Sequence, residues 1–135
     1  METSEIVRIN DKGEIVIPAN IRDVVGIVEG MHVMLKADIE RREIVIIPFT
    51  TTEADLVEFK ITLAHIPGAL AKCASFLGNH NINLLASESR TLQSGEIAEW
   101  VVVADISNCK ENIRDLCKKM VEENYAKNAI CRTFQ

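Results

Sequence analysis

The chain has 135 residues, enough for one ordinary domain or two small ones. Hydrophobic residues make up 47% and charged residues 26%, which is typical of a globular protein and excludes a disordered one. No apolar run approaches the roughly 18 residues that a membrane-spanning helix needs, and no signal segment opens the sequence. We therefore expect a cytoplasmic protein without a membrane partner.

The net charge of −5 lies entirely in the first part of the chain. Residues 1–55 hold 6 Lys/Arg and 11 Asp/Glu, a balance of −5, whereas residues 56–135 hold 9 of each. A protein that binds DNA through bulk charge is basic. If residues 1–55 bind DNA, a few basic side chains must be gathered on one face by the fold.

Short apolar segments separated by turns run up to Pro48. Gly13, in the turn signal "DKG", can adopt a positive φ. A brief helix is expected from Pro18 to Gly26, because proline suits the first helical turn and glycine a C-terminal stop. Alternating apolar residues predict two strands on each side of this helix, over residues 5–10, 14–18, 31–38 and 43–48.

This arrangement leaves about 45 residues to bury a core, so it needs a disulfide, a metal or a partner chain. The cysteines show no C-x-x-C spacing and have no His at zinc-finger distance. Cys73 and Cys117 fall on apolar helix faces, which favours a core role over metal or redox chemistry. We therefore expect a dimer, with no metal or cofactor. All four cysteines lie beyond residue 48: Cys73, Cys109, Cys117 and Cys131.

The segments lengthen after a polar stretch, residues 49–55, that we interpret as a linker. Asn108 and Glu111 predict a capping box for the second helix. "QSG" (residues 93–95) is a hairpin signal. The order is βαββαβ, a ferredoxin-like arrangement. Strands are expected at 56–63, 82–92, 97–106 and 129–134, and helices at 66–80 and 108–124. The inner face of the first of these helices carries Leu70, Cys73, Ala74 and Leu77.

The N-terminal pattern is that of a known family. "VRINDKGEIVIPANIRDVVGI", followed by "EGMHVMLKAD" and "EIVIIP", contains G-x-[VI]-x-IP-x-x-[IL]-R-x-x-x-G-[IL] without a gap from Gly13 to Ile27. Residues 5–48 thus resemble the AbrB/SpoVT-type swapped-hairpin domain, also found in antitoxins of the MazE type. The resemblance implies a β-barrel formed by two chains with interleaved hairpins, an obligate dimer, and suggests a prokaryotic host.

In that family, basic residues of the first strand, the turn and the short helix contact DNA. The resemblance carries this role to Arg8 and Arg22, and Lys12 in the turn adds a third charge. Glu14 and Asp23 stand where some relatives have arginine, and their carboxylates repel phosphate. The alternative is that Arg8 and Arg22 only pair on the surface with Asp11, Glu14 or Asp23, which would leave a dimerisation module.

The second half also resembles a family. "KITLAHIPGALAKCASFLGNHNINLLASES", with P-G-x-L entering a helix, is similar to the ACT domain, a regulatory module that commonly binds amino acids at subunit interfaces. Gly68 would let a ligand approach the backbone, and the N–H groups near Gly68, Ala69 and Leu70 are free donors for a carboxylate. The resemblance adds His65 and Asn83 to the ligand site. The alternative is an ordinary helix start in a purely structural domain.

Together the segments predict an α+β protein: a DNA-binding domain (1–48), a linker (49–55) and an ACT-like regulatory domain (56–135). The leading hypothesis is a transcription regulator that binds double-stranded DNA as a homodimer, or as a tetramer through its ACT-like domains. A small molecule would control it, and the resemblance implies an amino acid. The alternative is an oligomerisation or protein-interaction module. We expect no enzyme, because no nucleophile constellation, H-E-x-x-H or phosphate loop is present.

Overall fold

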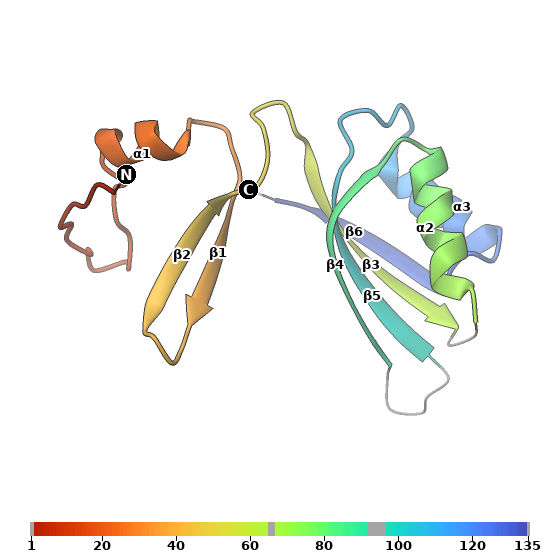
Figure 1. Cartoon of the computed structure of the whole chain (residues 1–135). Coiled ribbons are helices and arrows are strands. Elements are labelled where there is room, and N and C mark those ends of the chain that lie inside the picture. The colour runs from red at the N-terminus through yellow and green to blue at the C-terminus, as the bar shows by residue number, and fades with distance from the viewer. Residues whose placement is uncertain (1, 65–66, 92–96, 135) are drawn as a thin grey trace. The chain divides into compact units, whose positions relative to one another are not determined.

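The computed structural model describes residues 2–64, 67–91 and 97–134. The chain divides into two compact units, Met1–Glu53 and Ala54–Gln135. The fold is mixed α+β, with a two-stranded sheet in the first unit and a four-stranded sheet in the second (Figure 1). None of the helices in these ranges is long and apolar enough to cross a membrane.

The N-terminal unit contains one short helix and one hairpin. Helix α1 (Ala19–Val25) follows Pro18 and ends at Gly26, whose φ of 81° is left-handed and whose N–H donates to the Arg22 carbonyl at 2.8 Å. The expected helix is therefore confirmed, including both of its boundaries. The two later strands are confirmed as an antiparallel hairpin of β1 (Val33–Asp38) and β2 (Glu43–Pro48).

The two strands expected over residues 5–10 and 14–18 are absent, and only the turn between them forms. The backbone N–H of Asn10 donates to the Glu14 carbonyl at 3.1 Å, and Gly13 has a φ of 78°. The side-chain oxygen of Asn10 accepts from the N–H groups of Lys12 and Glu14 at 3.0 and 2.9 Å. The prediction of strands was wrong for the single chain, because an isolated two-stranded hairpin with nothing packed against it is marginal.

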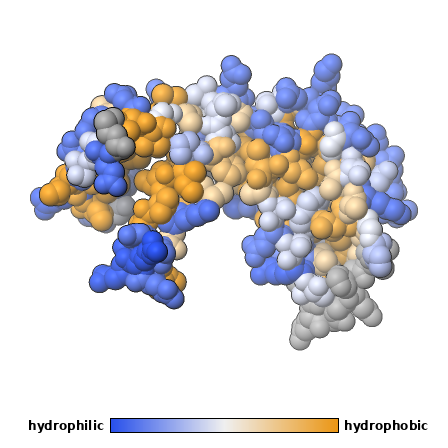
Figure 2. All heavy atoms as spheres, in the orientation of Figure 1, coloured by the Kyte–Doolittle hydropathy of each residue, from blue (hydrophilic) through white to orange (hydrophobic). Residues whose placement is uncertain are grey.

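None of residues 2–53 is buried. The hairpin has one wholly apolar face, because Val33, Leu35 and Ala37 pair with Pro48, Ile46 and Ile44 across the two strands. Leu35 and Ile44 on this face are 66% and 72% exposed. Other apolar side chains at the surface of this unit are visible in Figure 2. A single copy of this unit therefore has no hydrophobic core of its own.

The C-terminal unit has the expected βαββαβ order. The strands form an antiparallel sheet in the order β4-β5-β3-β6, and both helices lie on the same face of it (Figure 1). This order confirms the ferredoxin-like prediction. The "QSG" turn lies outside the described residues. The elements are β3 (Leu56–Ala64), α2 (Ala69–Asn79), β4 (Asn83–Thr91), β5 (Ile97–Asp105), α3 (Ile113–Glu122) and β6 (Asn128–Thr133).

The core of this unit lies between the sheet and the two helices. Two details of the sequence prediction were wrong. Leu70 is 41% exposed rather than buried, because it lies in the first turn of α2, beyond the part of the helix that covers the sheet centre. Helix α3 begins later than expected and is capped by Asn112, whose side chain accepts from the Asp115 N–H at 3.1 Å. The fully buried side chains include Phe59, Ile61, Leu77, Leu116 and Met120.

Replacing Phe59 by alanine tests where the stability resides. Phe59 is 0% exposed, and we expect Phe59→Ala to lower the free energy of unfolding of this unit by about 3–5 kcal/mol, through reduced burial and the cavity left behind. The measurement is urea denaturation followed by the fluorescence of Trp100, the only tryptophan in the chain. Ile130→Ala, at a side chain that is 55% exposed, is the control. Equal shifts for the two variants would contradict the assignment of the core.

Candidate functional site

Arg8, Lys12 and Arg22, the basic residues expected to contact DNA, are exposed in the N-terminal unit. The Nε of Arg22 donates to the Ile17 carbonyl at 3.0 Å, which ties helix α1 to the segment before it. The side-chain amide of Asn20 donates to a Glu5 carboxylate oxygen at 2.8 Å. These two bonds join helix α1, which carries Arg22, to the segments before it, and Glu5 belongs to the segment that contains Arg8.

The ion pairs proposed as the alternative role of these residues are not seen. Within the described residues, no salt bridge joins Arg8, Lys12 or Arg22 to an acidic side chain. The carboxylate of Glu14 instead accepts from the Asn10 side-chain amide at 2.9 Å. Glu14 therefore has a structural role in the turn.

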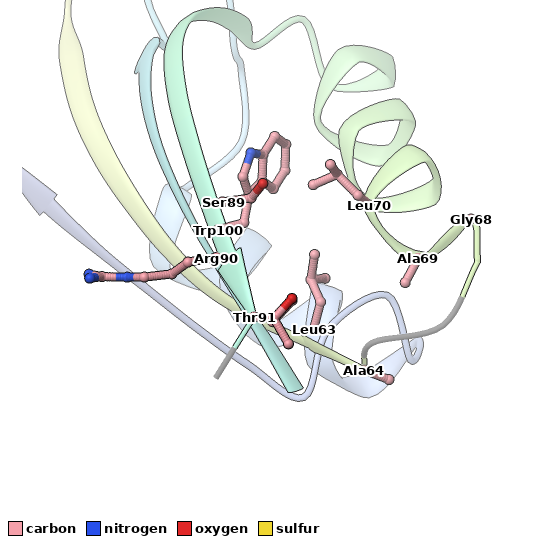
Figure 3. A pocket seen from close by; sticks show the side chains of 10 residues that line it. Leu63, Ala64, Gly68, Ala69, Leu70, Ser89, Arg90, Thr91 and Trp100 are labelled. Carbon is pink, nitrogen blue, oxygen red and sulfur yellow. The ribbon is translucent and has the colours of Figure 1, made fainter. Parts of the chain in front are cut away.

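A cavity of about 270 Å³ opens in the C-terminal unit between the start of helix α2 and the ends of strands β3, β4 and β5 (Figure 3). Its apolar lining includes Leu63, Leu70 and Trp100, and the hydroxyl groups of Ser89 and Thr91 stand beside them. The side chain of Arg90 points away from the others and binds Glu99 at 3.2 Å. The remaining lining residues are Ala64, Gly68, Ala69 and Ala98.

Helix α2 begins at the cavity. Gly68 precedes the helix with a φ of 84°, a left-handed conformation that L side chains rarely adopt. Among the described residues no side chain caps this end, and the first turn of the helix holds no acidic residue. The first N–H groups of a helix have no partner within it, and the helix dipole places partial positive charge there. This end of α2 therefore suits a carboxylate.

The structure brings together only some of the residues expected to bind a ligand. Gly68, Ala69 and Leu70 line the cavity. His65 lies outside the described residues. Asn83 does not line the cavity, because it begins strand β4 and lies roughly 20 Å along that strand from Ser89.

Ser89 and Thr91, the polar residues of the cavity, were not predicted from the sequence. Ser89 and Thr91 pair with Trp100 and Ala98 of strand β5, and therefore project from the same sheet face as the buried indole. The alternation of Ser89 and Thr91 around Arg90 was the available signal. This alternation does not indicate a cavity by itself, because only the strand register shows that Trp100, which is 4% exposed, lies beside Ser89 and Thr91.

The cysteines have the properties of core residues. Cys73 and Cys117 are buried, and all four thiols are free. Burial raises the pKa of the Cys73 thiol to about 11. Burial, together with the neighbouring Cys131 and Cys73 thiols, raises the pKa of Cys117 to about 12. Thiols that stay protonated near neutral pH are poor nucleophiles. Among the described residues, no group of three or more His, Cys, Asp or Glu is arranged to hold a metal ion.

No family model and no curated protein matches the chain. Solved structures do resemble part of the chain, and they include the following two. The regulatory subunit of aspartate kinase from Thermus thermophilus, in its ligand-free form, aligns with 58% of this chain at 14% identity and a TM-score of 0.46, and the alignment spans 51% of that subunit. The C-terminal domain of the MgtC protein from Mycobacterium tuberculosis aligns with 63% of this chain at 4% identity and a TM-score of 0.49, over 93% of that domain.

Thiol titration tests the burial of the cysteines. At pH 8 the native protein should expose two fast-reacting thiols, Cys109 and Cys131, to Ellman's reagent, because the Cys73 and Cys117 pKa values lie well above that pH. All four should react in denaturant. Since unfolding lowers these two pKa values towards 9.0, their contribution to stability is complete below pH 9 and is lost as the pH rises through about 11 and 12. Four fast thiols in the native protein would contradict this assignment.

Proposed function

We propose that the chain is a homodimeric, non-enzymatic regulator that binds double-stranded DNA through its N-terminal unit and a small-molecule effector, an amino acid or a close analogue, through its C-terminal unit. The observation that carries the proposal is the contrast between the two units. Among the described residues, the first has no core but presents Arg8, Lys12 and Arg22 without ion pairs, whereas the second has a core and a cavity. The AbrB/SpoVT-type and ACT-type resemblances of the sequence assign DNA binding and ligand sensing to these units.

The apolar face of the β1–β2 hairpin supports the proposed homodimer. A second copy would cover this face, and at roughly 25 cal/mol per Å² of buried apolar surface such contact is the main force available for association. The segments over residues 5–10 and 14–18, which lack strand partners in one chain, would gain them from the partner's hairpin. This arrangement is the interleaved dimer that the sequence resemblance implies.

Dimer formation would double the basic groups offered to DNA. A two-fold axis repeats Arg8, Lys12 and Arg22, so that about six positive charges face the phosphates. Glu14 is held by Asn10 and belongs to the turn. The proposed DNA contact therefore depends on the placement of a few charges, since the unit as a whole is acidic.

Effector binding would alter DNA affinity if it changed how the C-terminal units associate. Pairing of these units within a dimer, or between dimers in a tetramer, would set the spacing of the DNA-binding units. By linkage, an effector that strengthens DNA binding must itself bind more tightly to the DNA complex. The second candidate function, a module that only assembles oligomers, is favoured by the same exposed apolar face, and it predicts no role for the basic residues.

The first test of the proposed function separates DNA binding from assembly. We expect Arg8→Ala/Arg22→Ala to weaken binding to double-stranded DNA at least about 100-fold, because each charged hydrogen bond that is removed contributes on the order of 1.4 kcal/mol or more. The slope of log K against log salt should fall by about 0.9 for each phosphate that the variant no longer neutralises. Fluorescence anisotropy with genomic DNA fragments measures both quantities. The matched control is Arg114→Ala/Lys118→Ala, which removes the same charge from helix α3.

Both double variants should remain dimers by sedimentation. Equal DNA affinities for the wild type and Arg8→Ala/Arg22→Ala would favour the assembly module over the regulator.

The second test addresses the dimer itself. Leu35 is 66% exposed in the single chain, and we expect Leu35→Lys to shift the protein towards monomer and to lower its melting temperature, because the charge would be buried unpaired in the interface. Analytical ultracentrifugation over a range of protein concentrations measures the shift. Lys36→Ala, on the opposite face of β1, is the control and should leave the dimer intact. A wild-type protein that is monomeric at all concentrations would refute the proposed assembly.

A further inference from the structure

A second cavity of the C-terminal unit, of about 450 Å³, is lined by residues of α2, of the end of β3 and of the turn that follows α3. We call it the lysine cavity, because its charged residues are Lys72 of α2 and Lys127 of the turn, and no acidic residue is among its described lining residues. Of these lining residues, only Ala64 and Ala69 also line the cavity of Figure 3. The others are Pro67, Val121, Asn124, Tyr125 and Ala126.

The turn after α3 is fixed by contacts with three elements. The N–H of Tyr125 donates to the Met120 carbonyl in α3 at 2.9 Å. The Tyr125 ring packs against Phe76 of α2, with 4.7 Å between the ring centroids. The N–H of Lys127 donates to the Thr62 carbonyl in β3 at 2.8 Å. The wall that carries Lys127 is therefore held in place without a ligand, which lowers the entropy that binding would cost.

Neither lysine of the cavity has the partners that surface lysines most often have. Within the described residues, no salt bridge joins Lys72 or Lys127 to a carboxylate. A lysine near the end of a helix can instead bind the last carbonyl groups. In α3, however, the carbonyl groups of Lys119, Met120 and Val121 already accept backbone N–H groups of the following turn. The two ammonium groups therefore place uncompensated positive charge at one cavity.

The charge of the lining matches a phosphate monoester better than a carboxylate. A phosphate monoester carries a charge of about −1.5 to −2 at pH 7 and has three strong acceptor oxygens. Two ammonium groups balance this charge, whereas a monocarboxylate would leave one of them unpaired. The Asn124 amide and the Tyr125 hydroxyl are further hydrogen-bonding groups of the lining. We infer that the lysine cavity binds the phosphate group of a small phosphomonoester through Lys72 and Lys127.

The volume and the remaining lining limit the rest of the ligand. A water molecule in the liquid occupies roughly 30 Å³, so the lysine cavity has the volume of about 15 water molecules. Its other side chains are small and apolar, with Ala64, Pro67, Ala69, Val121 and Ala126. This space suits a phosphate group with a short carbon body. The site goes beyond the proposed function, since it is separate from both the proposed DNA contact and the cavity of Figure 3.

The first test uses Tyr125, the only tyrosine of the chain, as a reporter in the lining. Full-length protein that carries 3-fluorotyrosine should show a fluorine NMR signal that shifts saturably on titration with glycerol 3-phosphate. Glycerol at matched ionic strength should leave the signal unchanged. Glycerate, a monoanion with a similar carbon body, should bind at least about 10-fold more weakly, because it pairs with one ammonium group fewer.

Isothermal titration calorimetry repeats each titration, so that an unresponsive fluorine signal is not mistaken for an absence of binding. The absence of saturable glycerol 3-phosphate binding up to about 10 mM by both methods would overturn the inference. Equal affinities for glycerol 3-phosphate and glycerate would overturn the assignment of the site to phosphate.

Variants then locate the site. Lys72→Gln and Lys127→Gln should each weaken glycerol 3-phosphate binding about 10-fold, because each removes one charged hydrogen bond. Both side chains are exposed, so the variants should remain folded. Lys119→Gln, at an exposed position of α3 outside the lining, is the matched control and should bind as tightly as the wild type. Unchanged binding in Lys72→Gln and Lys127→Gln would overturn the inference.

Double-stranded DNA also presents phosphate groups, so its affinity is measured for the same variants. We expect Lys72→Gln and Lys127→Gln to bind DNA as the wild type does. Weaker DNA binding by these variants, with no glycerol 3-phosphate binding by the wild type, would assign the lysines to nucleic acid and overturn the inference. Glycerol 3-phosphate binding by a protein that binds no DNA would support the site and refute the proposed regulator.

Discussion

The N-terminal unit cannot bury its own apolar side chains, and the organisation of the protein follows from this constraint. None of residues 2–53 is buried, although the β1–β2 hairpin has a continuous apolar face. Conformational entropy costs on the order of 1–2 kcal/mol for each ordered residue, and burial of apolar surface is the main term that can offset it. A single copy of this unit lacks that term, and the proposed homodimer would supply it, so that folding and association of the unit would be one process.

The C-terminal unit has the opposite character. Its helices cover one sheet face, and Phe59, Ile61 and Leu77 are fully enclosed, so this unit has a hydrophobic core within a single copy. The cavity lies at the edge of this core, where Leu70 stays partly exposed at the start of α2. A ligand bound there would stabilise the folded state by mass action. In the proposed regulator, a unit with its own core would bind the effector and leave the fold of the N-terminal unit undisturbed.

Local sequence patterns predicted most of the elements because the elements depend on local chemistry. Pro18 and Gly26 delimit α1, and the apolar periodicities of the second half indicated the βαββαβ order. The prediction of strands over residues 5–10 and 14–18 was wrong because a strand needs a neighbouring strand to pair with, and an alternating pattern of apolar residues does not provide one. The cavity residues Ser89, Thr91 and Trp100 were missed for a related reason. They are brought together by the register of β4 on β5, and a single sequence does not specify which residues of two strands lie opposite each other.

The acidic composition of the N-terminal unit is compatible with DNA binding when the range of electrostatic forces is considered. At physiological salt the Debye length is about 8 Å, so acidic residues distant from the contact surface are largely screened, whereas basic groups in contact with phosphate are not. The sign of the nearest charges therefore matters more than the balance of −5 over residues 1–55. Glu14, one of the acids near the basic residues, is engaged by Asn10. Long-range attraction to nucleic acid depends on a broad positive field, which this acidic unit lacks. Its overall charge would therefore disfavour nonspecific association with nucleic acid.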